Sequence, residues 1–119
     1  KPVIGLWLAL EDATTENGCL RIAPGQHRQG LKRRYIRDSN NQLTFLEQSP
    51  DPLDTSGAIP IQVPVGSVVA LHGFLPHASF ANNSSRSRCA MTFHVIDGDS
   101  EFAHDNWIKE PVRTNLGSR

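Results

Sequence analysis

Residues 65–95 read VGSVVALHGFLPHASFANNSSRSRCAMTFHV. The stretch alternates short β-branched and apolar runs with turn-forming residues, a pattern typical of consecutive short strands. His77 begins one predicted strand, and Arg88 begins the next one after a polar turn. A neutral histidine nitrogen suits a divalent metal, and an arginine grips a carboxylate through two parallel hydrogen bonds. The pair suggests a metal site with an acidic co-substrate.

The rest of the chain also consists of short strand patterns separated by turns. The first run, VIGLWLAL, is almost continuously apolar and fits a strand buried on both faces. It and the next run are expected to be neighbours in an antiparallel sheet. With six to eight strands and little helix, the chain is predicted to be an all-β sandwich, barrel or jelly roll. Strands are predicted at residues 3–10, 19–23, 43–46, 59–63, 67–72, 77–80 and 88–96.

Residues 26–64 contain the weakest strand patterns. Residues 26–38 are polar and basic, and residues 39–64 carry several prolines, which cannot donate to a sheet ladder. We therefore predict a loop excursion near 39–64 that holds only short edge strands.

The period-two geometry of a strand divides the side chains of the last run between two faces. Arg88, Thr92 and His94 share one face with Ala90, and this face leaves room for a ligand. The alternate residues are predicted to form core against a second layer; they are Cys89, Met91, Phe93 and Val95. Spacing alone leaves open whether Arg88 points to solvent or holds an anion inside the fold.

Composition sets outer limits on function. The 119 residues carry twelve basic and twelve acidic side chains, which gives no field that favours nucleic acid or an anionic membrane. No apolar run approaches the roughly 20 residues that span a bilayer. Cys19 and Cys89 are expected to be small buried hydrophobes in a reduced compartment. We expect a soluble intracellular protein, either cytoplasmic or peroxisomal.

The histidines do not form a local metal motif. The sequence contains no His-x-Asp, His-x-Glu or HExxH, so one motif cannot supply a complete metal site. His72 lies between an apolar strand and a glycine, which favours a hydrogen-bonded structural histidine over a metal ligand.

Several motifs together resemble the phytanoyl-CoA dioxygenase family of iron(II)- and 2-oxoglutarate-dependent oxygenases. They include the strand with Trp7, the His77-Ala78-Ser79 segment and Arg88. Further parts of the pattern are Glu11 to Thr14, Asn17 to Leu20, Pro24 to His27, Gly66 to Val69, Asn82, and the Asn106-Trp107 tail. Gln26 stands where the family usually has serine, and the family's upstream His-x-Asp is absent from this sequence.

The resemblance implies a double-stranded β-helix, a jelly roll that holds iron by two histidines and one carboxylate. By similarity, His77 is a metal ligand for Fe(2+), Arg88 and Ser79 bind the far carboxylate of 2-oxoglutarate, and Trp7 lines the co-substrate pocket. The implied reaction is hydroxylation of a small-molecule substrate, acyl-CoA-like or otherwise lipid-derived, with molecular oxygen and oxidative decarboxylation of 2-oxoglutarate.

The chain starts without methionine and enters an apolar strand within two residues. We therefore expect residues 1–119 to be one partial domain, the C-terminal part of a jelly-roll oxygenase domain, inactive alone. Two other functions remain open. One is a jelly-roll binding or structural module without catalysis. The other, a carbohydrate-binding sandwich, ranks last because the sequence lacks a row of aromatic residues.

Overall fold

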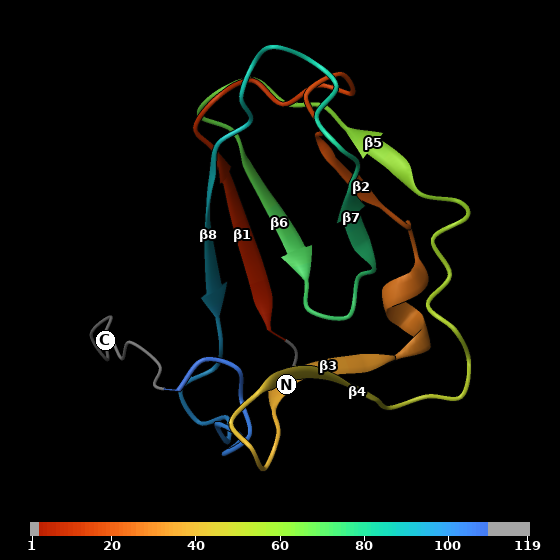
Figure 1. The fold of residues 1–119 in the computed structure, drawn as a ribbon, viewed down its shortest axis with the longest axis vertical. Coiled ribbons are helices and arrows are strands. Elements are labelled where there is room, and N and C mark those ends of the chain that lie inside the picture. Colours follow the sequence, from red (N-terminus) through yellow and green to blue (C-terminus); the bar gives the residue numbers. More distant parts are fainter. Residues whose placement is uncertain (1–2, 110–119) are drawn as a thin grey trace.

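The computed structural model describes residues 3–109 of the chain. Short strands dominate it, and its only helical element is one 3-10 turn within this range. The all-β prediction is confirmed (Figure 1). The elements are β1 (Ile4–Ala9), β2 (Leu20–Ile22), η1 (Gln26–Gln29), β3 (Arg33–Arg37), β4 (Leu43–Glu47), β5 (Ile59–Ile61), β6 (Val68–His72), β7 (His77–Ser79) and β8 (Ala90–Val95).

The strands form two three-stranded sheets and one hairpin, all antiparallel. The sheet orders are β6-β1-β8 and β5-β2-β7, and β3 pairs with β4. The predicted pairing of the first two strands is therefore wrong. Both edges of β1 are occupied by β6 and β8, so the chain crosses to the second sheet before β2 begins. From β5 to β8 the chain likewise alternates between the two sheets, as in a jelly roll.

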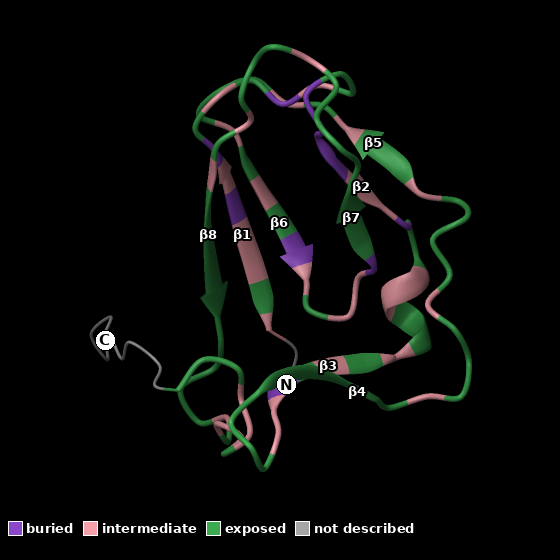
Figure 2. Cartoon of the chain, in the orientation of Figure 1, coloured by how far each residue is buried: buried purple, intermediate pink, exposed green. Residues whose placement is uncertain are grey.

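The core lies between the two sheets. Trp7 and Ala9 on β1 are buried, and they meet Leu20 of β2 and Leu71 of β6 in one cluster with Ala13 and Cys19. Figure 2 shows the buried positions on β1, β2 and β6, with exposed positions on the outer strands. β1 is buried on one face only, since Ile4 is 38% exposed. The prediction of burial on both faces is wrong.

Residues 91–95 of β8 are exposed whichever way they alternate, so the face predicted to be core is not core. Met91, Phe93 and Val95 are 47%, 50% and 50% exposed. Within residues 3–109, no third layer packs on this face. Cys89 is exposed as well, whereas Cys19 is buried as predicted. Neither cysteine forms a disulfide.

The excursion between the second and sixth strands is better ordered than the sequence predicts. β4 and the edge strand β5, which contains Pro60, appear where edge strands are predicted. β3 lies within residues 26–38, where no strand is predicted because the Arg-Arg-Tyr-Ile-Arg sequence has no strong apolar alternation. In the described part of the chain, no helix has the length and apolar character needed to cross a bilayer.

Candidate functional site

A cavity of about 320 Å³ opens beside the core, between β1 and the β3 strand. A volume of this order lies in the range of small-molecule sites. Trp7 and His77 both line the cavity, which brings together two of the four residues predicted for the site. Its walls also include Leu6, Leu20, Leu31, Arg33, Arg34, Tyr35, Leu71, His72, Thr92, Phe93, His94, Asn106 and Trp107.

Local hydrogen bonds give two of the cavity histidines opposite tautomers. His77 Nδ1 lies 2.9 Å from the carbonyl oxygen of Leu75. Because a carbonyl oxygen only accepts, Nδ1 carries the proton and the neutral ring keeps a free electron pair on Nε2. His72 Nδ1 instead accepts the N–H of Phe74 at 3.1 Å, so its neutral ring carries the proton on Nε2. The neutral His77 ring therefore has an unprotonated Nε2 that can bind a metal, whereas the neutral His72 ring has an Nε2–H that can only donate a hydrogen bond.

Arg88 lies against the ring of Trp7. Its guanidinium carbon is 5.7 Å from the ring centroid, and its Nε donates to the carbonyl of Gly18 at 3.1 Å. That bond leaves the two terminal nitrogens for another acceptor. Arg88 is partly buried, and whether it holds an anion stays a prediction.

The position of Arg88 is set by two loops that meet at one end of the sheets (Figure 1). Asn17 is only 3% exposed, and its Nδ2 donates to the carbonyls of Asp12 and Ser87 at 2.8 and 3.2 Å. Its Oδ1 accepts the backbone N–H of Thr14 at 2.7 Å. This buried amide therefore ties the loop after β1 to the residue before Arg88.

Glu11 makes a second link between the same loops. Its carboxylate accepts the Ser87 hydroxyl at 2.7 and 2.8 Å and the backbone N–H of Cys89 at 2.8 Å. The hydrogen bond from Ser87, followed by that from Cys89, lowers the pKa of Glu11 below its usual value. Glu11 thus holds the residues on both sides of Arg88, Ser87 through its hydroxyl and Cys89 through its backbone N–H.

Ser79 is the last residue of β7 and pairs with Leu20 of β2. It shares a strand face with His77, as period two requires, but it is exposed and does not line the cavity. Trp7 therefore lines the cavity together with His77 and contacts Arg88, whereas neither Arg88 nor Ser79 lines the cavity itself.

The described residues supply one good metal donor and no complete metal site. No group of three His, Cys, Asp or Glu side chains suitable for a metal occurs within residues 3–109. His77 fits a role as one ligand of iron(II), because its Nε2 is unprotonated in the neutral ring and its side chain reaches the cavity.

Sequence reasoning missed the supports of the site. Glu11 and Asn17 belong to the motifs that carry the resemblance, but the sequence assigns neither a role, although both hydrogen-bond to the Arg88 loop. The polar segment Glu-Asp-Ala-Thr-Thr-Glu-Asn-Gly, longer than a tight turn needs, is the signal that marks them. The sequence did not predict β3, so the cavity wall that β3 forms was not predicted either.

Comparison with protein families gives a match over most of the chain. The family model of phytanoyl-CoA dioxygenase (PhyH) matches residues 1–90. A phytanoyl-CoA dioxygenase of Arabidopsis thaliana is 47% identical over 106 residues, which are 88% of this chain and 37% of the relative. The phytanoyl-CoA dioxygenase domain-containing protein 1 of Bos taurus is 41% identical over 111 residues, 90% of this chain and 38% of the relative. The chain thus spans under two fifths of the length of these relatives.

Solved structures share the fold. EvdO2 from Micromonospora carbonacea var. aurantiaca, in complex with 2-oxoglutarate, aligns with a TM-score of 0.57 and 26% identity. The alignment covers 84% of this chain and 42% of that one. The two sheets described above are thus part of a jelly roll. From the sequence motifs, the family match and the fold, the chain belongs to the phytanoyl-CoA dioxygenase family.

Proposed function

We propose that the protein is an iron(II)- and 2-oxoglutarate-dependent oxygenase, with its co-substrate site between Arg88, Trp7 and His77. The observation that carries the proposal is the contact between Arg88 and Trp7 next to the cavity that His77 lines. Trp7 thus links the Arg88 cation to the cavity into which we propose that His77 directs a metal-ligand nitrogen. The family and the 2-oxoglutarate complex of EvdO2 support this assignment.

Arg88 binds the far carboxylate of 2-oxoglutarate in this proposal. Its Nε is committed to Gly18, so the two terminal nitrogens remain for a two-point contact with a carboxylate. Trp7 fixes the guanidinium from one side, which lowers the entropy lost when the acid binds. Ser79, on the same strand face as His77, is proposed as a second donor to that carboxylate, although it does not line the cavity.

His77 is one metal ligand in the proposed site. Leu75 holds the imidazole through Nδ1 and leaves Nε2 for the metal. Iron(II) bound there would supply oxygen activation coupled to the decarboxylation of 2-oxoglutarate. The residues of this chain contribute orientation, since the buried Trp7 and Leu71 exclude water from one wall of the cavity.

The 119 residues alone are proposed to be inactive. A facial triad needs three protein ligands, and residues 3–109 contain no group of three His, Cys, Asp or Glu side chains that could hold a metal. The substrate of the full-length protein is proposed to be a small organic molecule, acyl-CoA-like or otherwise lipid-derived, hydroxylated with molecular oxygen.

The test is succinate formation from 2-oxoglutarate by the purified full-length protein. We expect turnover that needs iron(II) and oxygen and stops when a chelator is added. A well-folded full-length protein that binds neither iron(II) nor 2-oxoglutarate contradicts the proposal and favours a jelly-roll module without catalysis.

A further inference from the structure

The cavity has a second end, which the proposed oxygenase chemistry does not use. Its wall opposite the core is built from β3 and the tail that crosses it. Ile36 forms a β-bridge to Asn106, and the ring of Trp107 lies 6.1 Å from that of Tyr35. The tail therefore fixes β3 against the cavity. Figure 1 shows this hairpin at the opposite end of the molecule from the loops that lead to Arg88.

Four cations lie on or next to β3, and three of them have partners within the fold. These partners explain the positions of three side chains without any ligand. Lys32 pairs with Asp51 at 3.6 Å, Arg34 contacts Asp105 at 2.5 and 3.2 Å, and Arg37 donates to the carbonyls of Trp107 and Asn41 at 3.1 and 3.4 Å.

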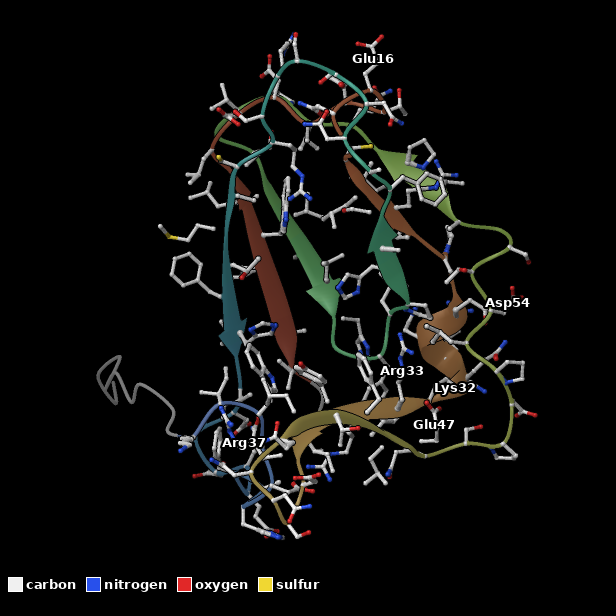
Figure 3. The ribbon with its side chains drawn as sticks, in the orientation of Figure 1. Glu16, Lys32, Arg33, Arg37, Glu47 and Asp54 are labelled. Atoms are coloured by element: carbon white, nitrogen blue, oxygen red, sulfur yellow. The ribbon has the colours of Figure 1, made fainter. Side chains whose placement is uncertain are left out.

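Arg33 is the fourth cation, and it differs from the others. Among residues 3–109, no carboxylate pairs with its guanidinium and no group accepts a hydrogen bond from it, although Glu47 lies opposite it in the strand register. Instead, its guanidinium carbon lies 4.3 Å from the centroid of the Phe45 ring. Arg33 also lines the cavity (Figure 3).

The stacking on Phe45 leaves the hydrogen-bonding edge of Arg33 available. A guanidinium that stacks through its face still presents its N–H groups in the plane, where they match two oxygens of a carboxylate or phosphate. Phe45 itself is held by Tyr35, with ring centroids 4.8 Å apart. The aromatic pair thus restricts Arg33 before any ligand binds, which reduces the entropy cost of binding.

We infer that Arg33 binds an anionic group of the substrate, a carboxylate or a phosphate, at the β3 end of the cavity. The inference rests on the proposed function, in which the reacting end of the substrate lies near His77. The substrate then spans the cavity with its charge at Arg33 and an apolar body against Trp7, Leu71 and Tyr35. The bound anion interacts with a cation that has no ion pair of its own.

The two tryptophans of the chain provide the readout, because Trp7 and Trp107 both line the cavity. We would titrate the full-length protein with hexanoate, hexyl phosphate and hexan-1-ol, following tryptophan fluorescence with saturating 2-oxoglutarate present. The three probes share one alkyl chain and differ in the end group. We expect at least one anion to bind about tenfold more tightly than the alcohol, as a charge-assisted contact predicts. Which anion binds better distinguishes a carboxylate from a phosphate substrate.

Substitutions at Arg33 test whether this side chain causes the preference for anionic probes over the alcohol. Arg33→Gln is expected to remove this preference. Arg33→Lys, which retains the charge without the planar guanidinium, is expected to show a weaker preference. Arg28→Gln is the matched control, because Arg28 is exposed on η1 and does not line the cavity. Equal binding of all three probes by the wild type, or an unchanged preference in Arg33→Gln, would overturn the inference.

A second measurement separates this inference from the proposed function. Slow succinate formation without substrate depends on iron(II) and 2-oxoglutarate, so Arg33→Gln is expected to leave it unchanged. Loss of this activity in Arg33→Gln, with its thermal unfolding unchanged, would place Arg33 in the co-substrate site and overturn the inference. An anion preference in a wild-type protein without succinate formation would uphold the anion site and contradict the oxygenase proposal.

Discussion

The Ser87 hydroxyl donates to the carboxylate of Glu11, with its Oγ 2.7 and 2.8 Å from the two carboxylate oxygens. The same carboxylate accepts the backbone N–H of Cys89 at 2.8 Å. Glu11 lies two residues after the end of β1, and Ser87 lies 76 positions further along the sequence. Arg88 lies between the two anchored residues. Its backbone position therefore depends on a carboxylate that never needs to touch a ligand.

Glu11→Ala in the full-length protein is expected to raise the KM for 2-oxoglutarate about tenfold with a smaller change in kcat, because Arg88 loses its backbone anchor. Glu11→Gln keeps an oxygen acceptor and is expected to restore part of the affinity. Steady-state titration of 2-oxoglutarate measures both effects. Glu16→Ala is the control, since this side chain points away from the fold at the same end of the molecule (Figure 3). An effect of Glu16→Ala equal to that of Glu11→Ala would exclude a positioning role.

The low pKa of Glu11 predicts a pH dependence of stability. Hydrogen bonds from Ser87 and Cys89 lower this pKa below the usual 4.5. A carboxyl with a lower pKa in the folded state stabilises the fold above its unfolded pKa and loses this effect as the pH falls through the folded pKa. The Tm of the wild type should exceed that of Glu11→Gln at pH 7, and the difference should shrink below about pH 4.5. Thermal unfolding followed by circular dichroism between pH 7 and pH 3 provides the measurement. A Tm difference that stays constant between pH 7 and pH 3 would show that the charge of Glu11 does not stabilise the fold.

Strand parity on β8 predicted only part of the cavity wall. Thr92 and His94 line the cavity, but Phe93, which alternates with them in the sequence, lines it as well. Burial of the opposite face was not predictable, since it depends on what packs there. Phe93 is apolar and yet 50% exposed. An alternating pattern identifies two faces of a strand but does not specify which partner covers each one.

Long-range partners explain the other failures. β1 and β2 are successive in sequence, but β1 pairs with β6 and β8, more than fifty residues later. The β3 strand is stabilised by β4 and by a bridge from Ile36 to Asn106. A polar strand of this kind depends on tertiary contacts more than on its own propensity. His77 and Arg88 were proposed from residue type and position, and Trp7 from the resemblance, whereas the links from Glu11 and Asn17 to the Arg88 loop emerge only from hydrogen bonds.

His77→Ala is expected to abolish metal binding in the full-length protein, and His72→Ala is expected to keep most of it. The reason is the tautomer, since His77 leaves Nε2 unprotonated while His72 uses Nδ1 to accept a backbone N–H. Calorimetric titration with manganese(II) in the presence of 2-oxoglutarate measures the metal affinity of each protein. Both residues line the cavity, so His72→Ala also controls for a change in cavity shape. Stronger metal loss in His72→Ala would transfer the ligand role to His72.

Arg88→Lys is expected to weaken 2-oxoglutarate binding by about 1–3 kcal/mol, because lysine keeps the charge but loses the two-point contact. It also loses the Nε bond to Gly18. A competition assay with 2-oxoglutarate and its analogue N-oxalylglycine would give the affinity of each protein. Arg28→Lys provides the matched control on an exposed site. Similar losses at both positions would mean that Arg88 is not the carboxylate anchor.

Gly18→Ala tests whether the Arg88 loop depends on a close backbone approach. Gly18 has φ of 84°, and a Cβ there would lie 2.8 Å from the carbonyl oxygen of Phe80. Gly66 has the same φ of 84°, but a Cβ there would meet nothing within 4 Å. Alanine in a left-handed conformation costs about 1–2 kcal/mol at either position, so the excess loss at Gly18 measures the contact with Phe80. Urea unfolding of both variants should show Gly18→Ala to be the less stable.

Because the Gly18 carbonyl also accepts the Nε–H of Arg88, this variant alone should raise the KM for 2-oxoglutarate. Equal stability losses with an unchanged KM would separate the loop from the function of Arg88.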